Sequence, residues 1–137
     1  MGKIKATAKW IRDFQLLVKN SKGHQVICDY PVAGGGDNAG PTPLDLAVMS
    51  LAGCAAIIFT DVCKQSKIQL DKFEVVAEAE KTAGSPKLAD ISIKAKVSSK
   101  SRKQLLEAAW RRTEANCPVL YVFQDALPIR VQFEIAK

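Results

Sequence analysis

The sequence predicts an α+β fold in which antiparallel sheets pack against long helices. Two observations carry this prediction. Apolar and polar residues alternate with a period of two in several short segments, as they do in strands buried on one face. One long, nearly apolar helical stretch and a second, amphipathic one interrupt these segments and give the order β-β-β-α-β-β-α-α-β. Runs of strands and helices without a regular βαβ alternation are typical of α+β domains.

The first 31 residues are predicted to form three strands. Ile4, Ala6, Ala8 and Trp10 alternate with polar residues, a second strand lies around Phe14–Val18, and a third runs from about His24 to Tyr30, where Pro31 ends it. A glycine-rich loop follows over residues 32–41. It lacks the Gly-Lys-Ser/Thr ending of a phosphate-binding loop, so we interpret it as a flexible crossover to the next element.

The central helix is predicted over about residues 42–67. Thr42 is a good N-cap, Pro43 suits the first helical position, and Asp45 completes a capping box with Thr42. The first half of the helix is apolar on nearly every side, and such a helix must be buried over most of its surface. The other elements of one small domain can bury only part of this surface, so we expect a second subunit to bury the rest.

Residues 73–137 are predicted to form a hairpin, two helices and a last strand. The hairpin strands are Phe73–Ala79 and Ile91–Val97, and a second capping box, Ser101 with Gln104, begins a helix that ends near Asn116. A short apolar segment then runs from Cys117-Pro118 to about Phe123, and Ile129, Val131, Phe133 and Ile135 alternate as in a strand. Because we find no internal repeat and no long linker, we expect residues 1–137 to form one domain.

The composition excludes several classes of protein. With 47% hydrophobic and 25% charged residues, the chain has the balance of a globular protein. The longest nearly apolar run, Leu46–Phe59, is shorter than the ~20 residues of a membrane span, and no signal-peptide pattern is present, so we expect a soluble, cytoplasmic protein. The net charge is +6, but the densest basic segment, residues 94–103, has no aromatic residue for base stacking, which argues against a nucleic-acid partner.

The four cysteines have different local contexts. No Cys-x-x-Cys pair occurs, so a zinc site is not expected, and Cys28 and Cys63 are interpreted as buried core residues. Cys117 precedes Pro118 at a predicted helix start, and a helix N-terminus lowers the pKa of a thiol. Cys54 lies in the middle of the central helix among apolar residues, and taken alone it fits a packing cysteine.

Two sequence motifs together resemble one known family. Gly40-Pro41-Thr42-Pro43-Leu44-Asp45-Leu46, followed by Leu51-Ala52-Gly53-Cys54, closely resembles the OsmC/Ohr superfamily of osmotically induced and organic-hydroperoxide-resistance proteins. Cys117-Pro118 is similar to the second cysteine of that family, which lies at a helix start far downstream. The resemblance implies an OsmC/Ohr-like fold in which the sheets wrap around the central helices of an intertwined homodimer.

The resemblance also implies a thiol-dependent peroxidase that reduces organic hydroperoxides. Cys54 would be the peroxidatic cysteine, which becomes a sulfenic acid, and Cys117 the resolving cysteine, which condenses with it to a disulfide. An external, lipoyl-type dithiol would reduce that disulfide, and no metal or bound cofactor is implied. In the family, an arginine from the N-terminal strands, held by a glutamate, stabilises the peroxidatic thiolate, and Arg12 is the best placed arginine here.

The acidic residue departs from the family pattern. Where the peroxidases have Pro-Glu, this chain has Pro43-Leu44, and the acid comes one position later, at Asp45, on the helix face opposite Cys54. Val119-Leu120 replaces the polar residues common after the second cysteine, which resembles an OsmC-like branch of the superfamily. A second hypothesis therefore stays open, a redox-sensing or small-molecule-binding protein of the same fold without efficient turnover.

Overall fold

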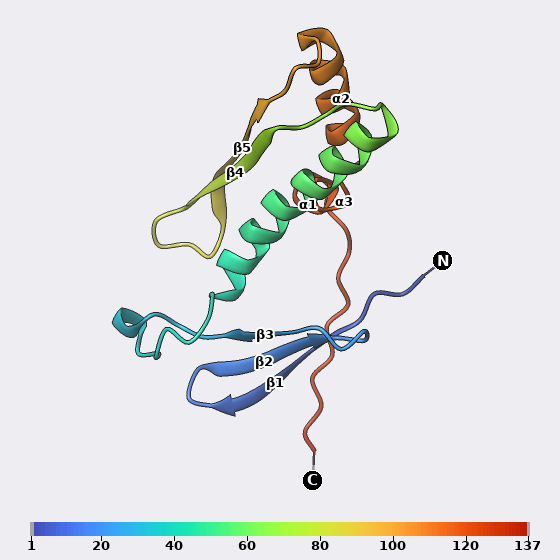
Figure 1. The fold of residues 1–137 in the computed structure, drawn as a ribbon. Helices are drawn as coiled ribbons and strands as arrows, with labels where there is room; N and C mark the ends of the chain where they lie inside the picture. Colours follow the sequence, from blue (N-terminus) through green and yellow to red (C-terminus); the bar gives the residue numbers. More distant parts are fainter. Residues whose placement is uncertain (1, 137) are drawn as a thin grey trace. The chain divides into compact units, whose positions relative to one another are not determined.

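The computed structural model describes residues 2–136. It divides into two compact units, one up to Ser50 and one from Leu51 onward, and the helix α1 (Pro43–Gln65) continues across the boundary (Figure 1). The predicted α+β fold with antiparallel sheets is confirmed. The single-domain organisation stays a prediction.

The first unit contains a three-stranded antiparallel sheet in the order β1-β2-β3. Its strands are β1 (Ala6–Arg12), β2 (Gln15–Asn20) and β3 (Gln25–Cys28), and a short 3-10 turn, η1 (Val32–Gly34), follows. Ala8 lies opposite Val18, which lies opposite Val26, so the predicted alternation sets the register. The first strand starts two residues later than the alternation predicts, because Ile4 lies outside the sheet and is fully exposed.

Asp29 holds the glycine-rich loop in place, so the loop is not the flexible crossover that the sequence suggests. One carboxylate oxygen of Asp29 accepts a hydrogen bond from the backbone N–H of Tyr30 at 2.7 Å. The other oxygen accepts hydrogen bonds from the N–H groups of Asp37 and Ala39, each at 3.1 Å. Gly36 lies against the carbonyl oxygen of Tyr30, where a side chain has no room. The loop therefore takes its shape from one buried carboxylate.

Replacement of Asp29 with Asn is expected to lower the urea midpoint of unfolding at pH 7 and to flatten its acid dependence. Burial by itself raises the pKa of the Asp29 carboxyl, but the hydrogen bonds from Ala39, Tyr30 and Asp37, with one from Gln15, lower it below its ordinary value. A carboxyl with a lowered folded-state pKa stabilises the fold above its unfolded pKa of about 3.9, and this contribution is lost as the pH falls through the folded-state pKa. Urea titrations between pH 7 and pH 3 check this, and parallel midpoint curves for the two proteins would contradict it.

The second unit is built around the greater part of α1 (Figure 1). Its other elements are the hairpin strands β4 (Lys72–Lys81) and β5 (Leu88–Ser98) and the helices α2 (Lys103–Asn116) and α3 (Pro118–Gln124). The pairs Val75–Ala95, Ala77–Ile93 and Ala79–Ile91 lie opposite one another in the hairpin and alternate with exposed residues. The predicted hairpin and both predicted helices are confirmed.

An aromatic cluster centred on Phe59 forms the core of the second unit. Phe59 is 2% exposed, and its ring lies 5.4 Å from that of Phe73 on β4 and 5.6 Å from that of Trp110 on α2. Cys63, one turn further along α1, is buried in the same core with Ile68. Burial raises the pKa of the Cys63 thiol, so this cysteine is a packing residue, as the sequence predicts.

α1 is slightly shorter than the range of about 42–67 that the sequence predicts, but it is long and apolar. Its 23 residues meet the length and composition of a membrane-crossing helix, so the expectation that no segment is long enough was wrong. A core helix of a soluble protein meets the same test. From Leu51 onward, α1 is a core helix of the second unit, because it buries Leu51, Ala55, Phe59, Val62 and Cys63.

One of the two predicted capping boxes forms and the other does not. The Asp45 N–H donates to the Thr42 hydroxyl at 3.1 Å, and the Thr42 N–H donates to the Asp45 carboxylate at 3.3 Å. The box predicted at Ser101 is absent, because α2 begins later, with Arg102 as its N-cap. The Ser101 N–H instead donates to the Ser99 hydroxyl at 3.1 Å, which keeps Ser101 in the preceding turn.

The predicted last strand does not form. Residues 126–136 have no strand conformation, and Ile129, Val131, Phe133 and Ile135 are between 80% and 90% exposed. A strand requires a neighbour that accepts and donates its backbone hydrogen bonds, and no strand within residues 2–136 pairs with this segment. The alternation predicted the conformation that the segment could adopt but not the presence of a partner.

Candidate active site

α1 and the joint between α2 and α3 position two cysteines side by side. Cys54 lies on α1, half-buried, between the buried residues Leu51 and Ala55. Cys117 is both the C-cap of α2 and the N-cap of α3, and its backbone is extended, with φ −83° and ψ 107°. Pro118 then begins α3, because its fixed φ suits the first helical position. The predicted helix start at Cys117 is confirmed.

A hydrogen bond from Tyr121 connects the two helices that meet at Cys117. The Tyr121 hydroxyl, on α3, donates a hydrogen bond of 2.9 Å to the carbonyl oxygen of Ala115, near the end of α2. This bond satisfies one of the carbonyl groups that a helix leaves unpaired at its C-terminus. It also connects the two helices across Cys117.

Cys54 and Cys117 lie close enough for their thiols to influence each other. All four cysteines are reduced in this structure. Cys63 lies on the opposite side of α1 from Cys54, as the nine-residue spacing predicts, and is buried in the core around Phe59. Cys28 is buried in the first unit. The structure therefore brings together the two cysteines that the sequence motifs single out.

Burial raises the pKa of the Cys117 thiol. The N–H group of Leu120, at the start of α3, lowers the pKa, the neighbouring Cys54 thiol raises it, and the N–H group of Val119 lowers it by less. The net direction is upward, so the expectation that the helix start lowers the pKa of Cys117 was wrong. The helix N-terminus acts as predicted, but the loss of water around a side chain in a residue only 1% exposed outweighs it.

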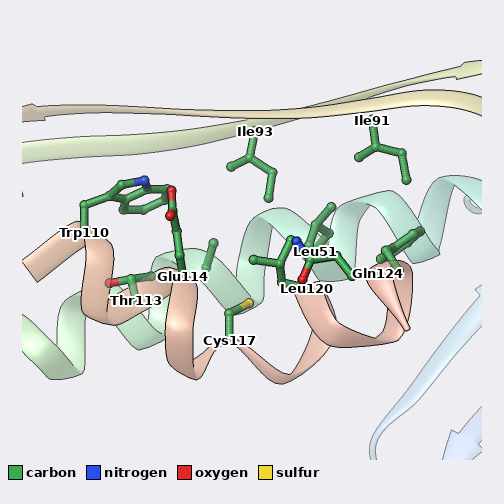
Figure 2. Close-up of a pocket in the computed structure, with 11 residues that line it drawn as sticks. Leu51, Ile91, Ile93, Trp110, Thr113, Glu114, Cys117, Leu120 and Gln124 are labelled. Atoms are coloured by element: carbon green, nitrogen blue, oxygen red, sulfur yellow. The ribbon is translucent and has the colours of Figure 1, made fainter. Parts of the chain in front are cut away.

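A cavity of about 430 Å³ lies beside Cys117 (Figure 2). Its walls come from α1, the inner face of β5, α2 and α3, and the lining residues are Leu51, Ala55, Ile91, Ile93, Trp110, Thr113, Glu114, Cys117, Leu120, Phe123 and Gln124. Figure 2 shows Ile91 and Ile93 directed at the helices, with Trp110 and Glu114 toward one end and Gln124 toward the other. Apolar and polar side chains both line the cavity, and Glu114 is the charged residue that lines it within residues 2–136.

Sequence reasoning missed Glu114 and Tyr121. Glu114 lies three residues before Cys117, so helical spacing alone places the two on neighbouring positions of one face. The role of Tyr121 has no comparable signal, because its hydrogen bond crosses a helix boundary whose angle the sequence does not give.

Arg12 and Asp45 both belong to the first unit. Arg12 ends β1 and is exposed, and Asp45 is occupied by the capping box with Thr42. Their functional roles stay predictions. Within residues 2–136, no three His, Cys, Asp or Glu side chains gather closely enough to hold a metal ion.

Comparison with known proteins places the sequence and the fold among relatives. Protein YhfA of Escherichia coli K12 is 24% identical over 135 residues, which cover 96% of this chain and 98% of that protein. The fold is similar to that of an OsmC-like protein from Mycoplasma pneumoniae, with a TM-score of 0.77, 17% identity, and coverage of 90% of this chain and 88% of that one. An organic hydroperoxide resistance protein OsmC from Legionella pneumophila gives a TM-score of 0.67, 19% identity and coverage of 90% of both chains. The family model for OsmC-like proteins matches residues 34–132, which include both cysteines of the pair, and the chain therefore belongs to the OsmC-like family.

Proposed function

We propose that the protein is a thiol-dependent peroxidase that reduces organic hydroperoxides in the cytoplasm. The observation that carries the proposal is the proximity of Cys54 and Cys117, next to a cavity that Leu51, Ala55 and Leu120 help to line. Two reduced cysteines in contact can form a disulfide with little movement of the backbone. Solved structures of similar fold include proteins named for organic hydroperoxide resistance, which supports the same chemistry here.

The proposed cycle has two oxidative steps. The Cys54 thiolate attacks one oxygen of the hydroperoxide, the O–O bond breaks, and the alcohol leaves while Cys54 becomes a sulfenic acid. The Cys117 sulfur then attacks the Cys54 sulfur, water leaves, and a disulfide forms. A half-buried Cys54 suits the first role, and a buried Cys117 with a raised pKa suits the second, because only the first thiol has to meet the peroxide.

The substrate class follows from the surroundings of the pair. Leu51, Ala55 and Leu120 line the cavity together with Cys117. An apolar site gains free energy from an alkyl or aryl group, which hydrogen peroxide lacks. We therefore propose a preference for organic hydroperoxides. From the family resemblance we also propose that Arg12 stabilises the Cys54 thiolate and that Asp45 stands in for the family glutamate.

Peptide mapping after one equivalent of cumene hydroperoxide tests the proposal directly. We expect a single new disulfide that joins the peptides of Cys54 and Cys117, detected by mass spectrometry after alkylation of the remaining thiols. Cys28 and Cys63 should remain thiols and be alkylated, because Cys117 is the cysteine that interacts with Cys54, whereas Cys28 is buried in the first unit and Cys63 in the core around Phe59. A disulfide that involves Cys28 or Cys63, or the absence of any new disulfide, would refute the proposed cycle.

We further propose that the protein works as a homodimer. Its support is the apolar C-terminal segment, in which Phe133 is 90% exposed and Val131 is 86% exposed. A second copy offers unpaired strand edges and apolar surface that this segment can cover.

Sedimentation analysis is expected to give twice the 14.9 kDa mass of the chain. Phe133→Ser should weaken the dimer by about tenfold or more, because it removes the apolar surface of a whole side chain from the interface. Glu134→Ala, on the alternate face of the same segment, is the matched control and should leave the dimer unchanged. A monomer at all concentrations, or equal effects of the two variants, would argue against this dimer.

The second candidate function is a redox-sensing or small-molecule-binding protein without efficient turnover. The observation that favours it is Pro43-Leu44, where the family peroxidases have Pro-Glu. Rapid oxidation of Cys54 by one equivalent of peroxide, with no further turnover on addition of a dithiol, would support this candidate over the peroxidase.

A further inference from the structure

A second cavity, of about 620 Å³, lies between β5 and α2 in the second unit. It is larger than the cavity beside Cys117, and no cysteine within residues 2–136 lines it. Trp110 lines both cavities, and Figure 2 shows it toward one end of the cavity beside Cys117. The second cavity is therefore a separate site, which the proposed peroxidase cycle does not use.

The interior of this second cavity is apolar. Phe59 from α1 and Leu106 and Trp110 from α2 line it, and Ala95 and Val97 line it from β5. Val97 has the inward-facing parity of β5, yet it is 36% exposed, since the cavity lies beside it. The volume lies within the range of about 300–1,000 Å³ that small-molecule sites occupy.

Three charged residues of α2 line the same cavity at intervals of four positions. Lys103, Glu107 and Arg111 therefore lie on one face of the helix. The Lys103 Nζ lies 3.7 Å from a carboxylate oxygen of Glu107, so these two charges offset each other. Arg111 forms no ion pair within residues 2–136, which leaves one net positive charge at the cavity.

We propose that this cavity binds a small amphipathic carboxylate, with its apolar chain against Trp110 and Val97 and its carboxylate on Arg111. An alkyl chain gains free energy when it leaves water for apolar surface. A guanidinium presents a planar pair of N–H donors that matches the two oxygens of a carboxylate. A cationic head group would be repelled by Arg111, and a neutral one would leave its charge without a partner.

A small ligand fits this cavity better than a protein surface does. A protein partner that covers the cavity would remove water from Arg111 and from the Lys103–Glu107 pair together, and the loss of hydration around charges costs free energy. A small carboxylate reaches Arg111 and leaves the pair in water, where its side chains are 84% and 52% exposed.

Fluorescence of Trp110 tests the binding. The chain has two tryptophans, and Trp10→Phe removes the other one, a 69% exposed ring on β1 in the first unit. Titration of this full-length variant with decanoate, below its micelle concentration, is expected to give a saturable change in emission. Decyltrimethylammonium, with the same chain and a positive head group, should bind more weakly by about fivefold or more. Equal affinities, or no saturable change because a second subunit covers the cavity, would overturn the inference.

A charge variant tests the role of Arg111 in the same Trp10→Phe background. Arg111→Gln should weaken decanoate binding by about fivefold or more, because it removes a charge-assisted hydrogen bond, and should change the affinity for neutral 1-decanol by less than about twofold. Arg102→Gln is the matched control, since its side chain makes no capping hydrogen bond and does not line the cavity. Equal losses of decanoate affinity in the two variants would contradict a specific contact with Arg111 and overturn the inference.

A variant that fills the cavity shows which of the two cavities Trp110 reports. Ala95→Leu should weaken the binding of decanoate and of 1-decanol by about tenfold or more, because the added side chain occupies the space of the ligand. Ser92→Leu, on the opposite face of β5, is the matched control and should change neither affinity. Unchanged binding in a folded Ala95→Leu would place the ligand elsewhere and overturn the inference. If the leucine disturbs the strand, as circular dichroism would show, the comparison of Arg111→Gln with Arg102→Gln still decides it.

Discussion

Replacement of Cys54 with Ser is expected to reduce the consumption of cumene hydroperoxide to the rate of the protein-free control. A serine hydroxyl is not ionised near neutral pH and cannot form a sulfenic acid, so the loss should be on the order of a thousandfold or more. The helix should be unaffected, because a hydroxyl replaces a half-buried thiol of similar size. The measurement is peroxide consumption with a dithiol present in excess.

Two further cysteine variants show whether this loss is specific. Cys63→Ser, in the core, should retain activity in the fraction of protein that circular dichroism reports as folded. Cys117→Ser should react once with peroxide and then stop, because no partner thiol forms the disulfide that the dithiol reduces. Equal losses in Cys63→Ser and Cys54→Ser would count against Cys54 as the peroxidatic residue.

Phe59→Ala is expected to lower the free energy of unfolding by about 3–5 kcal/mol. Phe59 is 2% exposed and contacts the rings of Phe73 and Trp110, so truncation leaves a cavity between a strand and two helices. The contacts of three elements are lost at once, and the backbone of a long helix cannot move to fill the space. Urea unfolding followed by circular dichroism measures the change.

Val122→Ala is the control for the loss of apolar side-chain atoms. Val122 lies on α3 and is 70% exposed, so its truncation should change the free energy of unfolding by less than about 0.5 kcal/mol. A loss below about 1 kcal/mol for Phe59→Ala would mean that the second unit does not depend on this aromatic cluster.

Features that depend on neighbouring residues could be predicted. The start of α1 follows from Thr42, Pro43 and Asp45, because a capping box involves residues only three positions apart. The hairpin follows from the alternation of β4 and β5, since a period of two assigns each side chain to one face. The expectation that Cys54 and Cys63 lie on opposite faces of the helix needed only the helical repeat.

The predictions at Ser101 and Asp29 failed for a different reason. At Ser101 the local pattern favoured a capping box. Instead, the N–H group of Ser101 donates a hydrogen bond to the Ser99 hydroxyl, and Arg102 rather than Ser101 is the N-cap of α2. At Asp29 the sequence showed only an acid after a strand, whereas the structure uses it to order a loop eight to ten residues away. In both cases a competing hydrogen bond, formed in the folded chain, decided the outcome.

The sequence by itself determined where most of the helices and strands of this protein lie and which two cysteine motifs it carries, because these features are encoded within a few residues. Only the tertiary structure decided that burial outweighs the helix N-terminus in raising the pKa of the Cys117 thiol, and that Cys117 rather than Cys54 faces a cavity. It also decided that residues 126–136 remain without a strand partner in the single chain. Solvent exclusion and strand pairing depend on segments distant along the chain, so no local pattern can report them.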